Sequence, residues 1–89
     1  MTPITRIVEP YVTKQQGRSY AVFRLSEAPD PTWISKFKER ASSSGVDPFT
    51  VKVTADELAI GVRGEEDLRN LAAIVERLLK GTNIETGRL

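Results

Sequence analysis

The fold is decided by residues 49–62, which read FTVKVTADELAIGV. Large apolar residues alternate with polar or small ones on both sides of Ala55-Asp56, which is the spacing of half-buried strands. A two-residue turn there would pair three sets of apolar residues: Val53 with Leu58, Val51 with Ile60, and Phe49 with Val62. Because a slip of one residue would send one strand's apolar set to the opposite face, the pattern predicts a hairpin with one apolar face.

The segment before this hairpin predicts a helix. Asp30 suits the N-cap position, and Pro31 suits the first helical residue. The serines at 42–44 and then Gly45 would end the helix, because glycine accepts the left-handed conformation of a C-terminal cap. The apolar residues between these signals share one helical face: Trp33, Ile34, Phe37 and Ala41.

The segment after the hairpin predicts a second helix. The acidic residues 65–67 suit a first turn, where negative charge interacts favourably with the helix dipole. Lys80 and Gly81 would close the helix, so residues 82–89 are expected to form a frayed tail. A broad apolar face runs along it, made of Leu68, Leu71, Ala72, Ile74, Val75, Leu78 and Leu79.

Two further strands are predicted upstream. Residues 18–25 alternate, with Ala21, Phe23 and Leu25 on one side and Tyr20, Val22 and Arg24 on the other. Residues 4–13 are rich in β-forming residues but contain Pro10, which restricts them to an edge strand and leaves a flexible arm as the alternative. As a strand, this segment would pair Thr13 with Arg18, Tyr11 with Tyr20, Pro10 with Ala21 and Val8 with Phe23, and residues 14–17 would form the loop.

The order of elements predicts an α+β fold. The chain runs ββαββα. The right-handed crossover rule places the first helix on the face of Phe23 and Val51, and short connections place the second helix on the same face of an antiparallel-rich four-stranded sheet. Such a two-layer sandwich corresponds to a ferredoxin-like arrangement, permuted so that its last strand comes first. We expect one domain over residues 1–89, with an ordered core of about residues 4–81 and the tail at 82–89.

Composition excludes several chemistries. The 89 residues contain no cysteine and no histidine, so disulfides, thiolate metal sites and a histidine base are absent. Net charge is +1, no apolar run approaches the ~20 residues of a membrane span, and no secretory signal pattern is present. We therefore expect a cytoplasmic protein that does not enter a membrane.

No residue pattern predicts catalysis, a metal site or a cofactor. The serines at 42–44 lie at an expected helix end, and the acidic pairs Asp56-Glu57 and Glu65-Glu66 lie at a hairpin tip and a helix start. Residues 61–64 (GVRG) run from a strand into a helix and could hold an anion, but the acids at 65–67 would repel it. We expect a protein that is not an enzyme and needs no cofactor.

The sheet face away from the helices, called the open face below, is the candidate interface. The expected interface residues are Ile7, Tyr11, Tyr20, Val22, Arg24 and Lys52. Exposed apolar and aromatic patches mark association surfaces, so the sequence predicts a protein-protein interaction or assembly module, self-associating as a homo-oligomer, in the simplest case a dimer, or binding another protein. The alternative is a single-stranded nucleic-acid-binding domain whose tyrosines stack on bases, although RNP1-like residues are missing and the charge is nearly neutral.

Overall fold

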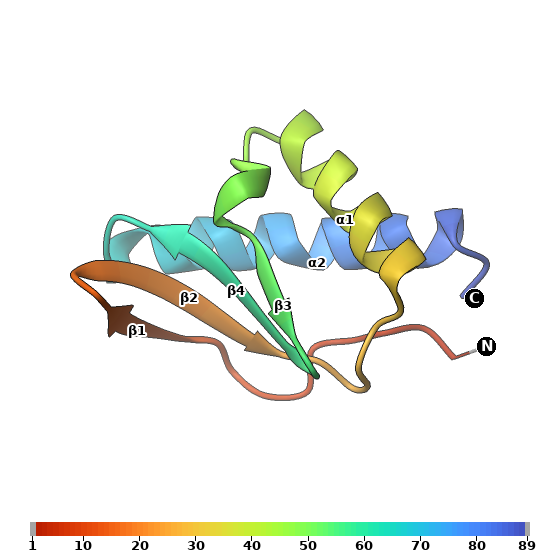
Figure 1. Ribbon diagram of the computed structural model, residues 1–89, viewed down its shortest axis with the longest axis horizontal. Helices are drawn as coiled ribbons and strands as arrows, with labels where there is room; N and C mark the ends of the chain where they lie inside the picture. The colour runs from red at the N-terminus through yellow and green to blue at the C-terminus, as the bar shows by residue number, and fades with distance from the viewer. Residues whose placement is uncertain (1, 89) are drawn as a thin grey trace.

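The computed structural model describes residues 2–88, which form one sheet and two α-helices (Figure 1). The sheet order is β1-β2-β4-β3, and all three neighbouring pairs are antiparallel. This confirms the predicted α+β fold, and the strand order is the one that the permuted ferredoxin-like arrangement requires. The elements are β1 (Tyr11–Gln15), β2 (Arg18–Arg24), α1 (Pro31–Ser43), η1 (Pro48–Thr50), β3 (Lys52–Thr54), β4 (Glu57–Val62), η2 (Glu65–Asp67) and α2 (Leu68–Glu85), where η denotes a 3-10 helix.

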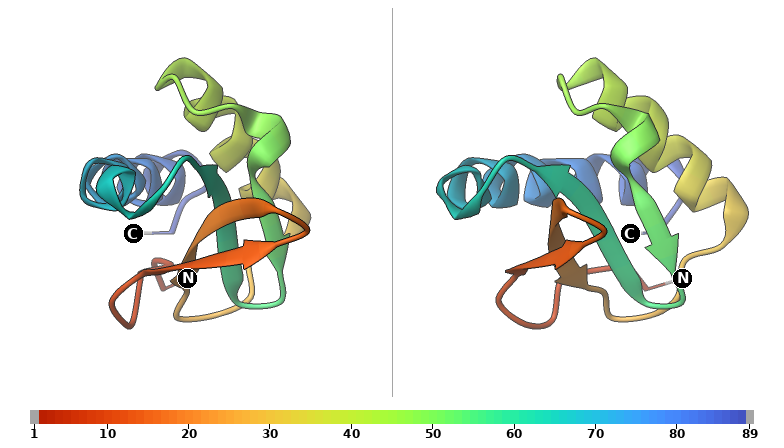
Figure 2. Two further views of the ribbon diagram at one scale, coloured as in Figure 1. Left: turned by 90° about the vertical axis from the view of Figure 1, so that its left-hand side faces the viewer. Right: turned by 60° about the vertical axis from the view of Figure 1, so that its left-hand side comes forward.

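The core lies between the two helices and one face of the sheet. Phe23 of β2 and Leu58 of β4 are fully buried together with Trp33 and Phe37 of α1 and Val75 of α2. The rings of Trp33 and Phe37 stack with centroids 5.3 Å apart. Figure 2 shows β1 on the side of the molecule away from α1. Both helices therefore cover one face of the sheet and leave the open face without a second layer.

The β3–β4 hairpin has the predicted register at its closed end. Val53 pairs with Leu58, and the chain turns at Ala55-Asp56, where Ala55 has a φ of +53°. The prediction for Phe49 was wrong, because this residue lies in η1 with 93% of its surface exposed. The side chain of Asp47 accepts a hydrogen bond from the Phe49 amide at 2.9 Å, which caps a helical turn where a strand was expected.

The first strand exists, but its predicted register was wrong by two residues. Tyr11 pairs with Val22 and Gln15 with Arg18, so the connection is a two-residue turn at Gln16-Gly17 and the predicted longer loop is absent. Both turn residues have positive φ, 52° and 76°, a combination that suits tight hairpins. Residues 4–8 are not part of this strand and contact β2 through a single bridge between Arg6 and Leu25.

The C-terminal prediction was also wrong, because α2 does not end at Gly81 and residues 82–88 are not a frayed tail. The helix continues to Glu85, and Gly87, whose φ is +77°, turns the chain away from the helix axis. The Gly87 amide donates to the Ile84 carbonyl at 3.2 Å, and the Arg88 amide donates to the Asn83 carbonyl at 2.7 Å. This bond pattern is a Schellman cap. The predicted tail residue Leu89, like Met1, lies outside the described residues.

Two buried polar side chains, Asn83 and Arg88, fasten the two ends of the chain together. Asn83 is 6% exposed and hydrogen-bonds both the amide and the carbonyl of Ile4, which is itself fully buried. The Arg88 guanidinium donates to the Thr2 carbonyl at 3.0 Å and to the Glu27 carboxylate at 3.1 Å. Thr82 of α2 is fully buried as well, but its hydroxyl has no hydrogen-bond partner among the described residues. The contacts of Asn83 and Arg88 show that the packed part of the chain extends beyond residue 81.

Candidate interaction surface

The strand register brings most of the predicted interface residues onto the open face. Tyr11, Val22 and Lys52 lie in one row across the sheet, with Ala59 between the last two, because directly paired residues share a face. Tyr20 lies in the next row, opposite Thr13. Tyr11 therefore lies opposite Val22, whereas the predicted register placed it opposite Tyr20.

Tyr20 and Val22 are far less exposed than a patch of free aromatic and apolar groups requires. Their exposed fractions are only 9% and 7%, although no helix covers them. The Lys52 Nζ atom lies 5.0 Å from the centroid of the Tyr20 ring and donates a long hydrogen bond of 3.5 Å to its hydroxyl. The prediction of an exposed tyrosine pair was therefore wrong, because neighbouring side chains of the sheet itself cover one of the two rings.

The exposed apolar surface lies instead at the edge of the open face. Ile7, Val8 and Tyr11 are 54%, 50% and 52% exposed, and we call these three residues the apolar margin. The Ile7 amide donates to the Arg24 carbonyl at 3.0 Å, which holds Ile7 beside the end of β2. Val8 was not among the predicted interface residues, since the regular pairing of Val8 with Phe23 would have buried it.

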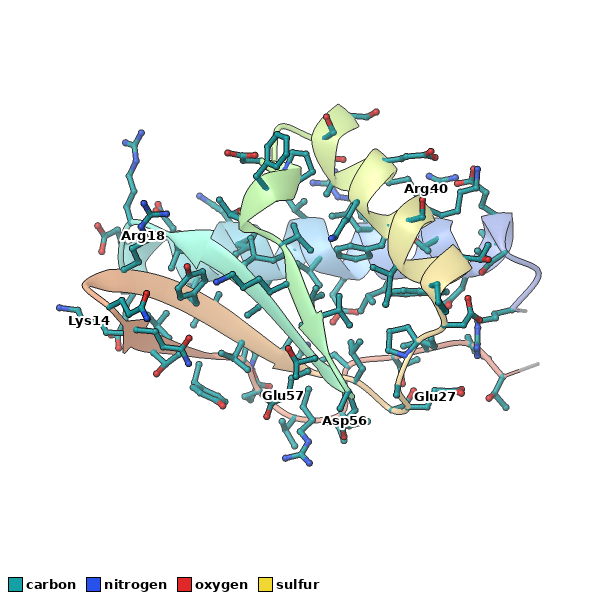
Figure 3. All side chains as sticks on the ribbon, viewed as in Figure 1. Lys14, Arg18, Glu27, Arg40, Asp56 and Glu57 are labelled. Carbon is teal, nitrogen blue, oxygen red and sulfur yellow. The ribbon has the colours of Figure 1, made fainter. Side chains whose placement is uncertain are left out.

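Charged groups on the open face are separated along the strands. Figure 3 shows Arg18 at the end of the sheet with the β1–β2 turn, and Asp56 and Glu57 at the opposite end. Arg24 pairs with Asp56 at 3.3 Å. In the described part of the chain, no oppositely charged group lies within 4.0 Å of the side chains of Arg18, Lys52 or Glu57. These three charges are thus available to a partner.

The other candidate residues have structural roles. The Ser43 hydroxyl donates to the Glu39 carbonyl within α1, and Ser44 is the C-cap of that helix. At the GVRG segment, the Arg63 amide donates to the Asp67 carboxylate at 3.2 Å, so the chain itself occupies the amide that an anion would need. Residues 2–88 contain no group of three or more histidine, cysteine, aspartate or glutamate side chains arranged to hold a metal ion.

The carboxyl group of Asp30 has a pKa that departs from its usual value. The Trp33 amide donates to its side chain at 2.8 Å, and this bond holds the pKa of Asp30 below its usual value, with a smaller contribution from Arg88. A lowered pKa keeps the carboxylate charged and so favours its capping of α1. The shift therefore reflects helix capping and gives no sign of acid-base chemistry.

Comparisons with known proteins add no family to this description. No protein-family model matches the chain, and neither curated proteins nor solved structures give a match. Within residues 2–88, neither helix combines the length and apolarity needed to cross a bilayer.

Proposed function

We propose that the protein is a non-enzymatic assembly module of the cytoplasm that forms a homodimer through its open face and apolar margin. The observation that carries the proposal is the position of the exposed apolar groups. Ile7, Val8 and Tyr11 lie within five consecutive residues beside the sheet face that the helices leave uncovered. Contiguous exposed apolar surface of this kind is typical of association sites.

The charges of the open face favour a second copy of the chain as the partner. Arg18 and Glu57 lie at opposite ends of the sheet (Figure 3), and neither has an ion-pair partner among the described residues. A two-fold axis perpendicular to the strands would place the cationic end of one copy against the acidic end of the other. Such a contact is isologous and closes on itself, as a dimer requires. Lys52, held over Tyr20 near the middle of the face, would lie near the axis.

The expected dimer is weak. Burying a large apolar side chain stabilises by ~1.5–3 kcal/mol, so three half-exposed side chains per copy contribute up to about 9 kcal/mol in a dimer. Association itself costs at least ~4 kcal/mol. We therefore expect dissociation at low micromolar concentration and a measurable dimer only near ~1 mM.

The test is light scattering after size exclusion, run over a series of concentrations up to about 1 mM. Tyr11→Glu should keep the monomer folded, since Tyr11 is half exposed, and should abolish the rise in mass with concentration. Phe49→Glu is the matched control, because Phe49 is an exposed aromatic residue in η1 and lies outside the proposed interface. A monomeric wild type at the highest concentration, or equal effects of the two variants, would overturn the proposal.

The second candidate function is single-stranded nucleic-acid binding on the same face. Arg18 and Lys52 support it, because cations without carboxylate partners can contact phosphates. Among the described residues of the open face, Tyr11 offers a half-exposed ring for stacking, whereas Tyr20 is covered. Fluorescence anisotropy with a labelled oligothymidine separates the two functions. Micromolar binding that weakens steeply with added salt would favour nucleic acid, whereas self-association through apolar groups should change little with salt.

A further inference from the structure

A groove opens at the end of the sandwich and borders the open face, with which it shares Arg18 and Tyr20. It lies where the β1–β2 turn and the end of β4 meet the start of α2, at the left of Figure 1, and the loop between α1 and η1 forms its other wall. Its volume is about 640 Å³. Sites for small molecules typically measure ~300–1,000 Å³, so the groove is large enough for a small ligand.

The floor of the groove is apolar. Val46, Val62 and Ile74 are half-buried there, and Ile60 and Leu71 lie buried beneath them. These side chains come from the loop after α1, from β4 and from α2. Because α1 ends at Ser43, no helix extends over them. Gly61 of β4 also lines the groove and has no side chain. A Cβ atom at this position would lie only 3.1 Å from the Cβ of Thr50, so a larger residue would crowd Thr50.

The rim of the groove carries two arginines, Arg18 and Arg63, both exposed. Within residues 2–88, no carboxylate approaches either guanidinium within 4.0 Å. Figure 3 shows Arg18 beside the point where β4 leads into α2. Guanidinium groups without a carboxylate partner are strong hydrogen-bond donors to carboxylate and phosphate oxygens.

The two acids of the groove are already engaged with the backbone. Asp47 accepts a hydrogen bond from the Phe49 amide at 2.9 Å, and Asp67 accepts one from the Arg63 amide at 3.2 Å. These bonds partly satisfy both carboxylates, whereas the arginine donors have no such partner. The groove therefore combines an apolar floor with free cationic donors at its rim.

We infer that the end groove binds a small molecule with an apolar body and an oxyanion head group, the body on the floor and the head group between Arg18 and Arg63. Eight-carbon probes separate the contributions of body and head group. Octanoate and octyl phosphate carry the oxyanion, octanol carries no charge, and octylammonium carries the opposite charge. The tighter of the first two identifies the head group, and octanol should bind more weakly than either.

The experiment is a titration of the ¹⁵N-labelled protein followed by amide chemical shifts. Octanoate or octyl phosphate should shift the amides of Gly17, Gly61 and Asn70, which line the groove, and the shifts should saturate. The double variant Arg18→Gln, Arg63→Gln should weaken oxyanion binding about fivefold and leave octanol binding unchanged. Arg77→Gln is the matched control, because Arg77 is exposed on α2 outside the groove.

Three results would overturn the inference: no saturable shifts at millimolar probe, octylammonium binding as tightly as octanoate, or equal effects of the double variant and Arg77→Gln. Arg18 belongs to the proposed dimer contact as well, so the variant Tyr11→Glu separates the two proposals. Tyr11 does not line the groove, so Tyr11→Glu should bind octanoate as the wild type does even if it no longer dimerises.

Discussion

Replacing Asn83 with alanine should destabilise the protein more than any surface substitution in α2. The Oδ1 atom of Asn83 accepts hydrogen bonds from the Ile4 amide at 3.1 Å and from the Trp33 indole at 3.0 Å, and its Nδ2 donates to the Ile4 carbonyl at 2.9 Å. Alanine would leave all three groups buried without partners. Asn83 thus joins the N-terminal segment to both helices through one side chain.

The magnitude follows from the number of unpaired groups. Each buried polar group left without a hydrogen bond costs about 1–3 kcal/mol, so with three such groups we expect Asn83→Ala to lower the free energy of unfolding by at least about 3 kcal/mol. A domain of this size has a total stability of only roughly 4–13 kcal/mol. At ~4–8 °C per kcal/mol, the Tm should fall by at least about 12 °C.

Circular dichroism during thermal and urea unfolding measures the effect. Asn70→Ala is the matched control, since Asn70 is exposed on the same helix and alanine favours helix by up to ~0.7 kcal/mol over asparagine. Its Tm should therefore stay the same or rise slightly. If Asn83→Ala unfolds within a few degrees of Asn70→Ala, the three hydrogen bonds do not hold the termini, and residues beyond 81 behave as the frayed tail that the sequence predicts.

Two further predictions concern the hairpin and the cap of α1. Val51→Asp should lower the free energy of unfolding by several kcal/mol, because Val51 is 3% exposed. Phe49→Asp should change it by less than ~0.5 kcal/mol, because Phe49 is exposed. Urea unfolding of both variants measures the difference, and equal losses would mean that Phe49 belongs to the core. The pKa of Asp30 is lowered in the folded state, so its contribution to stability is present above the unfolded pKa of ~3.9 and is lost as the pH falls below that value. Asp30→Asn keeps a capping oxygen but cannot titrate. Its free energy of unfolding should therefore fall less than that of the wild type between about pH 5 and pH 3. Parallel losses in the two proteins would contradict this origin of the pKa shift.

The parts of the fold that the sequence predicts correctly rest on agreeing local signals. The alternation around Ala55-Asp56 favours the observed pairing of Val53 with Leu58, because a slip of one residue would turn one strand's apolar groups to the opposite face. Asp30 and Pro31 begin α1, and the Asp30 carboxylate accepts the Trp33 amide as an N-cap should. In each case the deciding residues lie close together in the chain.

Phe49 shows a local signal that competes with the alternation. Asp47-Pro48 has the same cap-and-proline pattern as Asp30-Pro31, and it begins the 3-10 helix η1 in the same way. The apolar alternation extends across it only by coincidence, since Phe49 is exposed. An aspartate-proline pair next to a predicted strand could therefore have shown where the strand begins.

The end of α2 could not be read from local signals alone. Both Gly81 and Gly87 are plausible C-terminal caps, and the apolar face ends at Leu79. Asn83 is buried because it bonds Ile4, 79 residues away, and this contact forms only after the fold has assembled. Gly81 has a separate role, because a Cβ atom there would lie 2.6 Å from the Arg40 guanidinium. The glycine makes room for the ion pair of Arg40 with Glu85, at 2.8 Å.

The exposed apolar margin and the wrongly predicted register of β1 have the same cause. Between the Arg6–Leu25 bridge and the Tyr11–Val22 pair, four residues of the N-terminal segment, 7–10, lie opposite only residues 23 and 24 of β2. Two residues are therefore extra, and Pro10 among them has no amide hydrogen to return to the ladder. In a regular strand Val8 would lie on the buried face with Phe23, but in this bulge it is half exposed beside Ile7. A feature that weakens the pairing of the edge strand thus creates the apolar surface that we propose as the dimer contact.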